Sequence, residues 1–241
     1  ADEAVTFFMH AGSSWQSLFF SYLGPNQHSL FSVLSNLMIA IFGNSEIAFR
    51  LPSVIAGSLA VPLTVLVGNR LTGSITVGWI AGILMLFSAS NIAWSQLGRG
   101  YALTICLSLA VIFFALKLED DLSRWSWRSG LILSGLAMVL TLPSSVYFLL
   151  GCAIAFLVRF HTTTKTNKSS YLKEKAKSLV PWAILFSLIL IYFFLNLSDL
   201  QRGVKIYKEY ARLLEGLENL AFTPARIIGI FENLISPWGL W

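Results

Sequence analysis

Charged residues are scarce in this sequence, and their scarcity excludes most classes of soluble protein. Asp, Glu, Lys and Arg together make up 12% of the chain, whereas hydrophobic residues make up 56% and the mean hydropathy is +0.70. Soluble domains carry about 25% charged residues and about 45–50% apolar residues. The composition therefore predicts an integral membrane protein.

Cysteine and histidine are also sparse. The two cysteines, Cys106 and Cys152, lie inside apolar runs, which excludes a framework of disulfides. The three histidines, His10, His28 and His161, lack the spacing of metal ligands. A metal held by Asp2 and Glu3 is conceivable, but we expect no metal site and no cofactor. The net charge of +5 is concentrated in a few short loops, as membrane topology signals are, and we expect no nucleic-acid partner.

Long apolar runs supply the expected membrane-spanning helices, because about 20 apolar residues are needed to cross a hydrocarbon core about 30 Å thick. Four runs qualify, namely residues 51–68, 75–92, 101–116 and 180–197. A fifth stretch, residues 129–158, is interrupted by "TLPSS" and predicts either a re-entrant hairpin or a pair of spans. The sequence thus predicts an all-α, polytopic transmembrane helix bundle.

Residues 28–42 predict an amphipathic helix at the membrane interface rather than a span, because the run is short and its apolar side chains share one helical face. Those side chains are Leu30, Leu34, Leu37, Met38 and Ile41. Three polar residues, Ser29, Ser32 and Asn36, lie mostly off that face.

The distribution of basic residues predicts which loops face the cytoplasm. No Lys or Arg precedes Arg50, whereas the loop at residues 161–178 carries five lysines and is therefore expected to be cytoplasmic. Counting spans back from that loop places residues 117–128 and Arg70 in the cytoplasm as well. Residues 1–50 then lie outside, provided that the short amphipathic helix does not cross.

The outer face on this count gathers polar residues that could act together: Asp2, Glu3, Asn26, His28, Arg50, Arg99 and Tyr101. Each has a plain interpretation when taken alone. The acidic pair could be a solvated cap, and the two arginines at helix ends could anchor lipid headgroups. Their combination is more informative than any one of them.

Four segments in register resemble the polyprenyl-phosphate-sugar-dependent glycosyltransferases of GT-C fold. They are "DEA" at 2–4, "NQH" at 26–28, "FGNSEIAFRLPSVIAG" at 42–57 and "WSQLGRGYAL" at 94–103. These enzymes include the dolichyl-phosphate-mannose–protein mannosyltransferases and the aminoarabinose transferases that modify lipid A. One departure is Ser29, since the family commonly has proline after the histidine.

The resemblance implies an inverting glycosyltransferase that moves a sugar from a polyprenyl-phosphate donor to a lipid, glycan or protein acceptor. It implies an enzyme of the bacterial inner (plasma) membrane, surrounded by membrane lipids, with its active site on the periplasmic or extracellular side. A sugar on a lipid phosphate already has a good leaving group, so the chemistry needs one carboxylate base and cations for the departing phosphate.

The resemblance also assigns roles to individual residues. Asp2 is the expected general base with Glu3 in support, although which of the two is the base stays open. Arg50 and Arg99 are expected to bind the donor phosphate. The residues expected to line the sugar or acceptor cavity are Asn26, His28 and Tyr101.

We expect a single transmembrane glycosyltransferase module, and a piece of a longer protein, because the family's first transmembrane helix should precede the acidic pair. Its expected parts are an outer loop at 1–50 with the interfacial helix, transmembrane helices at 51–197, a second outer loop at 198–223 and the start of a further helix at 224–241.

A polytopic transporter or flippase of lipid-linked substrates is the alternative. Ion-coupled transporters usually place ionisable residues near the membrane midplane. The four uninterrupted apolar runs contain no Asp, Glu, Lys, Arg or His, which favours an enzyme that opens to one surface. The "TLPSS" interruption keeps the transporter as the second interpretation.

Overall fold

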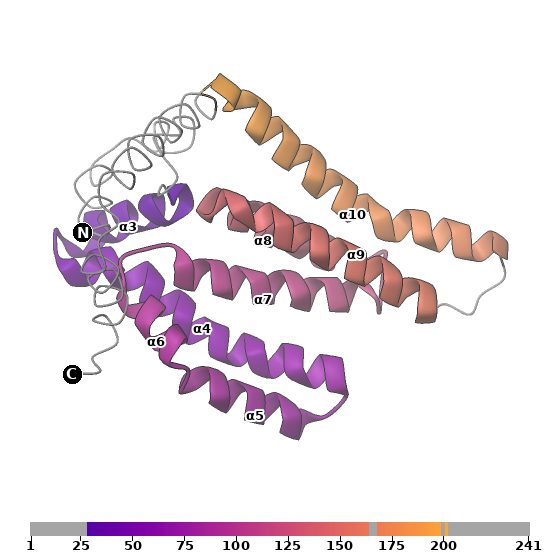
Figure 1. The fold of residues 1–241 in the computed structure, drawn as a ribbon, viewed down its shortest axis with the longest axis horizontal. Coiled ribbons are helices and arrows are strands. Elements are labelled where there is room, and N and C mark those ends of the chain that lie inside the picture. Colours follow the sequence, from indigo (N-terminus) through magenta and orange to yellow (C-terminus); the bar gives the residue numbers. More distant parts are fainter. Residues whose placement is uncertain (1–27, 164–167, 199–200, 202–241) are drawn as a thin grey trace, which may run out of the picture. The chain divides into compact units, whose positions relative to one another are not determined.

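The structure, a computed structural model, describes residues 28–163, 168–198 and 201 (Figure 1). Throughout these residues every regular element is a helix, which confirms the all-α prediction. The described residues up to Asn196 belong to one compact unit, and the paragraphs below concern that unit.

Helix α4 (Glu46–Thr72) begins and ends on residues with suitable capping chemistry. The side chain of Ser45 accepts a hydrogen bond from the backbone N–H of Ala48 at 3.2 Å, and Gly73 ends the helix at a φ of 71°. Serine is a preferred N-cap residue, and glycine adopts positive φ without strain. The 27 residues of α4 extend about 40 Å, which is enough to cross a membrane.

The run at residues 75–92, predicted as one continuous span, is instead broken into α5 (Ile75–Leu86) and α6 (Ala89–Gln96), which meet at 53°. The break lies at Ser88, which is extended and whose side chain accepts a hydrogen bond from the N–H of Asn91 at 3.4 Å. Serine starts a new helix here by satisfying an orphan N–H. An average over apolar residues does not detect such a local cap.

The chain then continues through α7 (Tyr101–Leu118) and α8 (Trp125–Thr141). The interruption at "TLPSS" is confirmed, because α8 ends there and a 3₁₀ turn, η1 (Pro143–Ser145), precedes α9 (Val146–Thr163). Ser145 Oγ donates to the carbonyl of Met138 at 3.0 Å and so provides a hydrogen-bond donor for a carbonyl group in the last turn of α8. The last described helix of the unit is α10 (Lys168–Leu195).

Three of these helices are long and apolar enough to cross a membrane: α4, α7 and the part of α10 at Lys177–Leu195. The bent pair of α5 and α6 would make a fourth crossing. Many large apolar side chains point outward, including Leu84, Phe87, Ile154 and Phe194 at 63–75% exposure. Exposed apolar surface on this scale fits lipid rather than water, as expected for an integral membrane protein.

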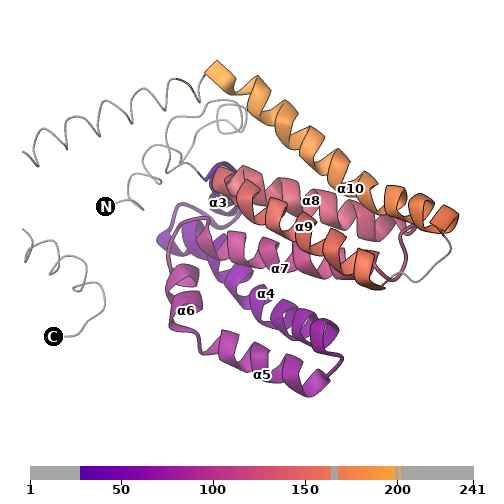
Figure 2. The ribbon, with the colours of Figure 1, turned by 45° about the vertical axis from the view of Figure 1, so that its right-hand side comes forward.

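Apolar side chains hold the helices together in two clusters. In Figures 1 and 2, α7 lies between α4 and α8, and α10 packs along α8. Leu118, Leu131, Leu149 and Leu185 form the centre of the larger cluster, and each is fully buried. The smaller cluster joins α4 to α7 through small side chains, which let two helix backbones approach closely: Ala56, Ala60, Ala102 and Cys106.

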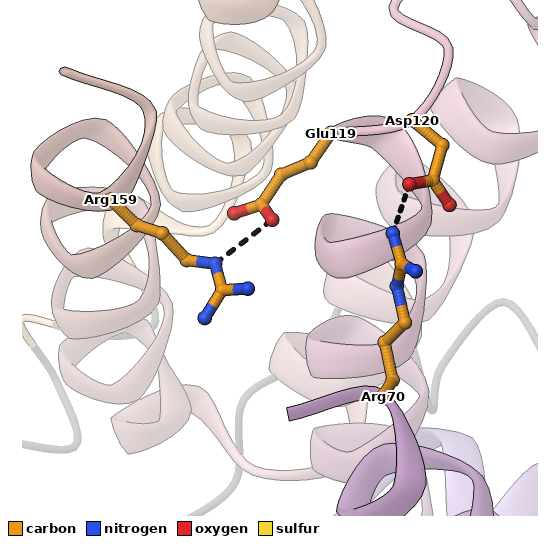
Figure 3. A network of polar contacts seen from close by, with 4 residues as sticks. All are labelled: Arg70, Glu119, Asp120 and Arg159. Atoms are coloured by element: carbon orange, nitrogen blue, oxygen red, sulfur yellow. Dashed lines mark hydrogen bonds and ion pairs between the residues drawn. The ribbon is translucent and has the colours of Figure 1, made fainter. Parts of the chain in front are cut away.

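The two ends of the unit differ in their polar contacts. At one end, called here the site end, Ser53 Oγ of α4 donates to the carbonyl of Arg99 at 2.9 Å. At the opposite end, called the ion-pair end, Arg70 pairs with Asp120, and Arg159 Nε donates to Glu119 Oε2 at 2.9 Å (Figure 3).

The contacts at the ion-pair end are consistent with part of the reasoning from basic residues. The sequence predicted that Arg70, the loop at residues 117–128 and the end of the fifth apolar stretch share one side of the membrane. The pairs that Glu119 and Asp120 make with Arg159 and Arg70 bring these three segments together. Helices α8 and α9 therefore both extend between the two ends of the unit. Neither is among the helices long and apolar enough to cross a membrane, so the pair of spans and the re-entrant hairpin both stay predictions.

Helix α3 (Ser29–Phe42) confirms the helix predicted at residues 28–42, but its buried residues are three serines and Phe31 rather than the predicted apolar face. Ser29, Ser32 and Ser35 are buried against the unit, and Ser35 Oγ donates to the carbonyl of Phe49 at 3.0 Å. The apolar side chains of Leu37, Ile41 and Phe42 point outward at 51–63% exposure. This arrangement is the reverse of a soluble amphipathic helix and suits a lipid surrounding.

The length of α3 excludes a straight crossing by this helix alone. Its 14 residues extend about 21 Å, whereas the hydrocarbon core is about 30 Å thick. Placement along the membrane surface stays a prediction.

Glycine lets α5 pack directly on the backbone of α4. A Cβ atom at Gly78 would lie 2.5 Å from the carbonyl oxygen of Val65 and 3.0 Å from the backbone nitrogen of Asn69. Gly82, one turn further along α5, faces the side chain of Val65. Glycines four residues apart are a common means of close helix packing in membranes.

We therefore expect Gly78→Ala to destabilise the protein, because the added methyl group meets backbone atoms that cannot rotate away. The expected cost is about 1–3 kcal/mol, as for other overpacked sites. Gly82→Ala should cost less, since the Val65 side chain can change rotamer. The measurement is the thermal unfolding midpoint of the detergent-solubilised protein, followed by its tryptophan fluorescence.

Gly151→Ala is the matched control. A Cβ at Gly151 of α9 would meet nothing within 4 Å, and alanine favours helix over glycine by about 1 kcal/mol. This variant should unfold at the same temperature or higher. Equal midpoints for Gly78→Ala and Gly151→Ala would contradict the close packing of α5 on α4.

Candidate active site

The predicted site residues divide into those that the structure describes and those that it does not. Asp2, Glu3 and Asn26 lie outside the described residues. The other four, His28, Arg50, Arg99 and Tyr101, are described, and all of them lie at the site end. The grouping of these four from three separate stretches of the sequence is the main feature of the site.

His28 is held between the end of α8 and the start of α7. Its side chain is 1% exposed, and Nδ1 donates to the carbonyl oxygen of Thr141 at 3.0 Å. Because a carbonyl only accepts, Nδ1 carries the proton in this contact. The imidazole ring also meets the edge of the Tyr101 ring, with 5.1 Å between ring centroids. The histidine is thus fixed in both position and tautomer.

Gly100 makes this arrangement possible. A Cβ at Gly100 would lie 2.6 Å from the Thr141 methyl carbon and 3.1 Å from His28 Nδ1. Glycine therefore allows the chain before α7 to approach both residues. Any larger residue here would separate His28 from its carbonyl partner.

Arg99 is a buried cation beside two aromatic rings. It is 7% exposed, and its guanidinium carbon lies 5.0 Å from the centre of the Tyr101 ring. Tyr101 in turn contacts Trp94, with 4.4 Å between ring centroids. A cation over an aromatic face is stabilised by the ring quadrupole, but an anion stabilises it much more. The position suits a site that receives a phosphate.

Arg50 occupies a more open position in the first turns of α4. It is 35% exposed and pairs with Glu46, one turn earlier, at 2.8 Å. Glu46 is 71% exposed, and such surface pairs contribute about 0–1 kcal/mol. The pair would therefore compete only weakly with a phosphate for the guanidinium of Arg50.

A hydrogen bond from Ser53 connects the segments that carry the two arginines. Ser53 lies one turn after Arg50 on α4, and its hydroxyl donates to the carbonyl of Arg99 at 2.9 Å. Ser53 is fully buried, so this hydrogen bond is shielded from solvent. It ties the loop that carries Arg99 to the helix that carries Arg50.

Three residues of this site were not predicted as site residues: Trp94, Gly100 and Thr141. Trp94 and Gly100 belong to the quoted segment at residues 94–103, so their signal was present in the sequence. For Thr141, the sequence indicated only that a helix ends close to this residue. Its carbonyl becomes an acceptor because α8 ends there, and no side-chain pattern indicates a backbone acceptor.

The arrangement combines positive charge with aromatic surface, which is chemistry suited to an anionic ligand. A buried guanidinium and a second, more open one supply positive charge, while aromatic rings supply flat apolar surfaces. Electrostatic stabilisation by such fixed donors is often the largest single contribution to catalysis. Among the described residues, Glu46 is an acid at this site, and it is paired with Arg50.

Comparison with protein families places this arrangement in a known context. The family model described as dolichyl-phosphate-mannose-protein mannosyltransferase matches residues 29–198, which include Arg50, Arg99 and Tyr101. Comparisons with curated proteins and with solved structures gave no significant match. The matched region covers the helices from α3 to α10, so the chain belongs to the dolichyl-phosphate-mannose-protein mannosyltransferase family, a family of membrane glycosyltransferases with a GT-C helical bundle.

Proposed function

We propose that the protein transfers a sugar from a polyprenyl-phosphate donor to a lipid, glycan or protein acceptor at the outer face of the membrane, with inversion at the anomeric carbon. The observation that carries this proposal is the buried Arg99, whose guanidinium lies over the ring of Tyr101. The same tyrosine ring contacts His28. A buried cation at the mouth of an apolar bundle suits an anionic group on a lipid tail.

In this mechanism the acceptor hydroxyl or amine attacks the anomeric carbon from the side opposite the phosphate. Asp2 takes the proton of the acceptor, and Glu3 supports Asp2 or binds the acceptor. The bond between the anomeric carbon and the phosphate oxygen breaks, and its electron pair stays on the phosphate. Arg50 and Arg99 stabilise the charge that develops there.

The remaining predicted residues shape the cavity. His28 presents a fixed tautomer, so Nε2 is the ring nitrogen that can accept a hydrogen bond from a sugar hydroxyl. Tyr101 is placed by both His28 and Trp94 and offers a hydroxyl group and a ring edge. Asn26 is assigned to the same cavity, two residues before His28 in the sequence.

The outer location is supported by the distribution of charge. Among the described residues, the connections at the site end, residues 43–45, 97–100 and 142–145, contain no lysine, whereas the ion-pair end leads into the lysine-rich segment at residues 161–178. Positively charged loops stay in the cytoplasm. This distribution supports an outer location for the site end and for the reaction.

The match to the mannosyltransferase family favours a glycosyltransferase over a transporter, which was the alternative interpretation of the sequence. A transfer assay tests the proposal directly. Full-length protein in sealed, right-side-out vesicles should transfer radiolabelled sugar from added polyprenyl-phosphate sugar, and the product should have the inverted anomeric configuration. Transfer that occurs in inverted vesicles alone would contradict the outer location. A retained configuration would contradict the single-displacement mechanism.

A further inference from the structure

A cavity of about 280 Å³ opens between α4, α7 and α9 at the ion-pair end, away from the candidate active site. Its walls are mostly apolar and include Leu71 of α4, Ile112 and Leu116 of α7, and Ala155 and Phe156 of α9. Ala155 is exposed, so the cavity opens sideways from the helix bundle. An apolar cavity that opens toward lipid suits an apolar chain better than water.

The polar part of this cavity contains a carboxylate and a guanidinium that pair with each other. Glu119 follows α7 and Arg159 lies near the end of α9, and Arg159 Nε donates to Glu119 Oε2 at 2.9 Å (Figure 3). The Glu119 side chain is 17% exposed, whereas that of Arg159 is 47% exposed. The carboxylate therefore lies deeper than the guanidinium.

Glu119 has an acceptor that the described part of the chain does not satisfy. Its Oε1 atom is buried and has no hydrogen-bond partner there. A buried carboxylate oxygen without a donor is costly, and polar atoms in this position are usually paired. A ligand with an N–H donor would satisfy it, and an ammonium group would do so with a charge-assisted hydrogen bond.

The charges around the cavity mouth select among lipids. The charged residues that line the cavity are Glu119 and Arg159, and Asp120, the residue after Glu119, pairs with Arg70 (Figure 3). A purely anionic headgroup would meet Glu119 unfavourably. A headgroup with both an ammonium and a phosphate could place the ammonium at Glu119 and the phosphate at Arg159, whose guanidinium has five N–H donors.

We infer that this cavity binds a bilayer phospholipid with a primary-amine headgroup, of the phosphatidylethanolamine type, from the leaflet that surrounds the ion-pair end. One acyl chain lies among the apolar residues of α7 and α9, and the ammonium donates to Glu119 Oε1. This site is separate from the sugar-transfer site, and the inference does not depend on the transfer reaction.

Phosphatidylcholine provides the critical comparison, because its quaternary ammonium has the same charge but no N–H to donate. The experiment is native mass spectrometry of the full-length protein in detergent with phosphatidylethanolamine, phosphatidylcholine and phosphatidylglycerol of identical acyl chains. One charge-assisted hydrogen bond predicts about a tenfold preference for phosphatidylethanolamine over phosphatidylcholine. Glu119→Gln should reduce this preference, because the amide oxygen still accepts a hydrogen bond but carries no negative charge.

Two substitutions in α9 separate binding in the cavity from lipid bound elsewhere. Ala155→Trp fills the cavity and should remove the preferentially bound lipid, whether or not Glu119→Gln folds well. Ile154→Trp is the matched control, because Ile154 is 63% exposed and does not line the cavity. It should bind lipid as the unaltered protein does.

Several results would overturn the inference. These are equal binding of phosphatidylethanolamine and phosphatidylcholine, a preference that is undiminished in Glu119→Gln, and unchanged binding in Ala155→Trp. Preferential binding of phosphatidylglycerol would show that the cavity selects an anion instead. Displacement of the bound lipid by polyprenyl phosphate at equal concentration would assign the cavity to the donor.

Discussion

Replacing Asp2 by Asn in the full-length protein is expected to lower the rate of sugar transfer by about 10²–10⁴-fold, the usual effect of losing a general base. Asparagine keeps the size and most of the hydrogen bonding of aspartate, but it cannot take the proton of the acceptor. Binding of the lipid donor should be nearly unchanged. The measurement is transfer from a radiolabelled polyprenyl-phosphate sugar, with the amount of folded protein determined in parallel.

Glu3→Gln is the matched control for Asp2→Asn, since it removes the neighbouring carboxylate in the same conservative way. A smaller loss is expected if Glu3 only supports the base. If Glu3→Gln were inactive while Asp2→Asn remained active, the two roles should be exchanged. Nearly normal transfer by both variants would remove the acidic pair from the mechanism.

Arg99→Ala is expected to reduce kcat/KM by about 10²–10³-fold, the range found when one donor to a developing negative charge is removed. Arg99 is 7% exposed beside the Tyr101 ring, so water cannot easily replace its charge. The loss should appear in both donor binding and turnover, because the phosphate is bound before and during its departure. Initial rates measured against donor concentration separate the two.

Arg99→Lys addresses the possibility that alanine at this buried position disturbs folding. Lysine keeps the positive charge but loses the planar fork that binds phosphate through two hydrogen bonds. We expect it to retain part of the activity at normal stability. Arg99→Lys with full activity would assign Arg99 to general charge balance rather than to phosphate recognition.

Two other arginines calibrate the effect of Arg99. Arg50→Ala should cause a smaller loss than Arg99→Ala, since Arg50 is 35% exposed and its charge is partly screened by solvent. Arg124→Ala should leave transfer unchanged, because Arg124 lies at the opposite end of α8 over the Trp127 ring. Equal losses in all three variants would indicate a general effect on stability or expression.

Hydropathy and residue order predicted a large part of the fold. The apolar runs at 51–68, 101–116 and 180–197 became α4, α7 and the second half of α10. Apolar length is a strong signal because a membrane requires about 20 apolar residues per crossing. The helix break after Thr141 was also predicted, since proline and two serines interrupt an otherwise apolar stretch.

Other features depended on contacts that hydropathy does not contain. The bend between α5 and α6 depends on one serine cap, and the inward side of α3 includes Ser35, which donates to the backbone carbonyl of Phe49 on α4. Both features depend on individual hydrogen bonds. An apolar average assigns the same value to either outcome.

The sequence by itself determined the class of protein, its helical elements, its family resemblance and the short list of polar residues at one end. Only the tertiary structure decided that Tyr101 contacts both His28 and Arg99, and that His28 donates to the carbonyl of Thr141, 113 residues away. The physical reason is that composition and periodicity constrain what each helix can bury. Side chains meet across helices only when close packing at small residues such as Gly100 brings the backbones together.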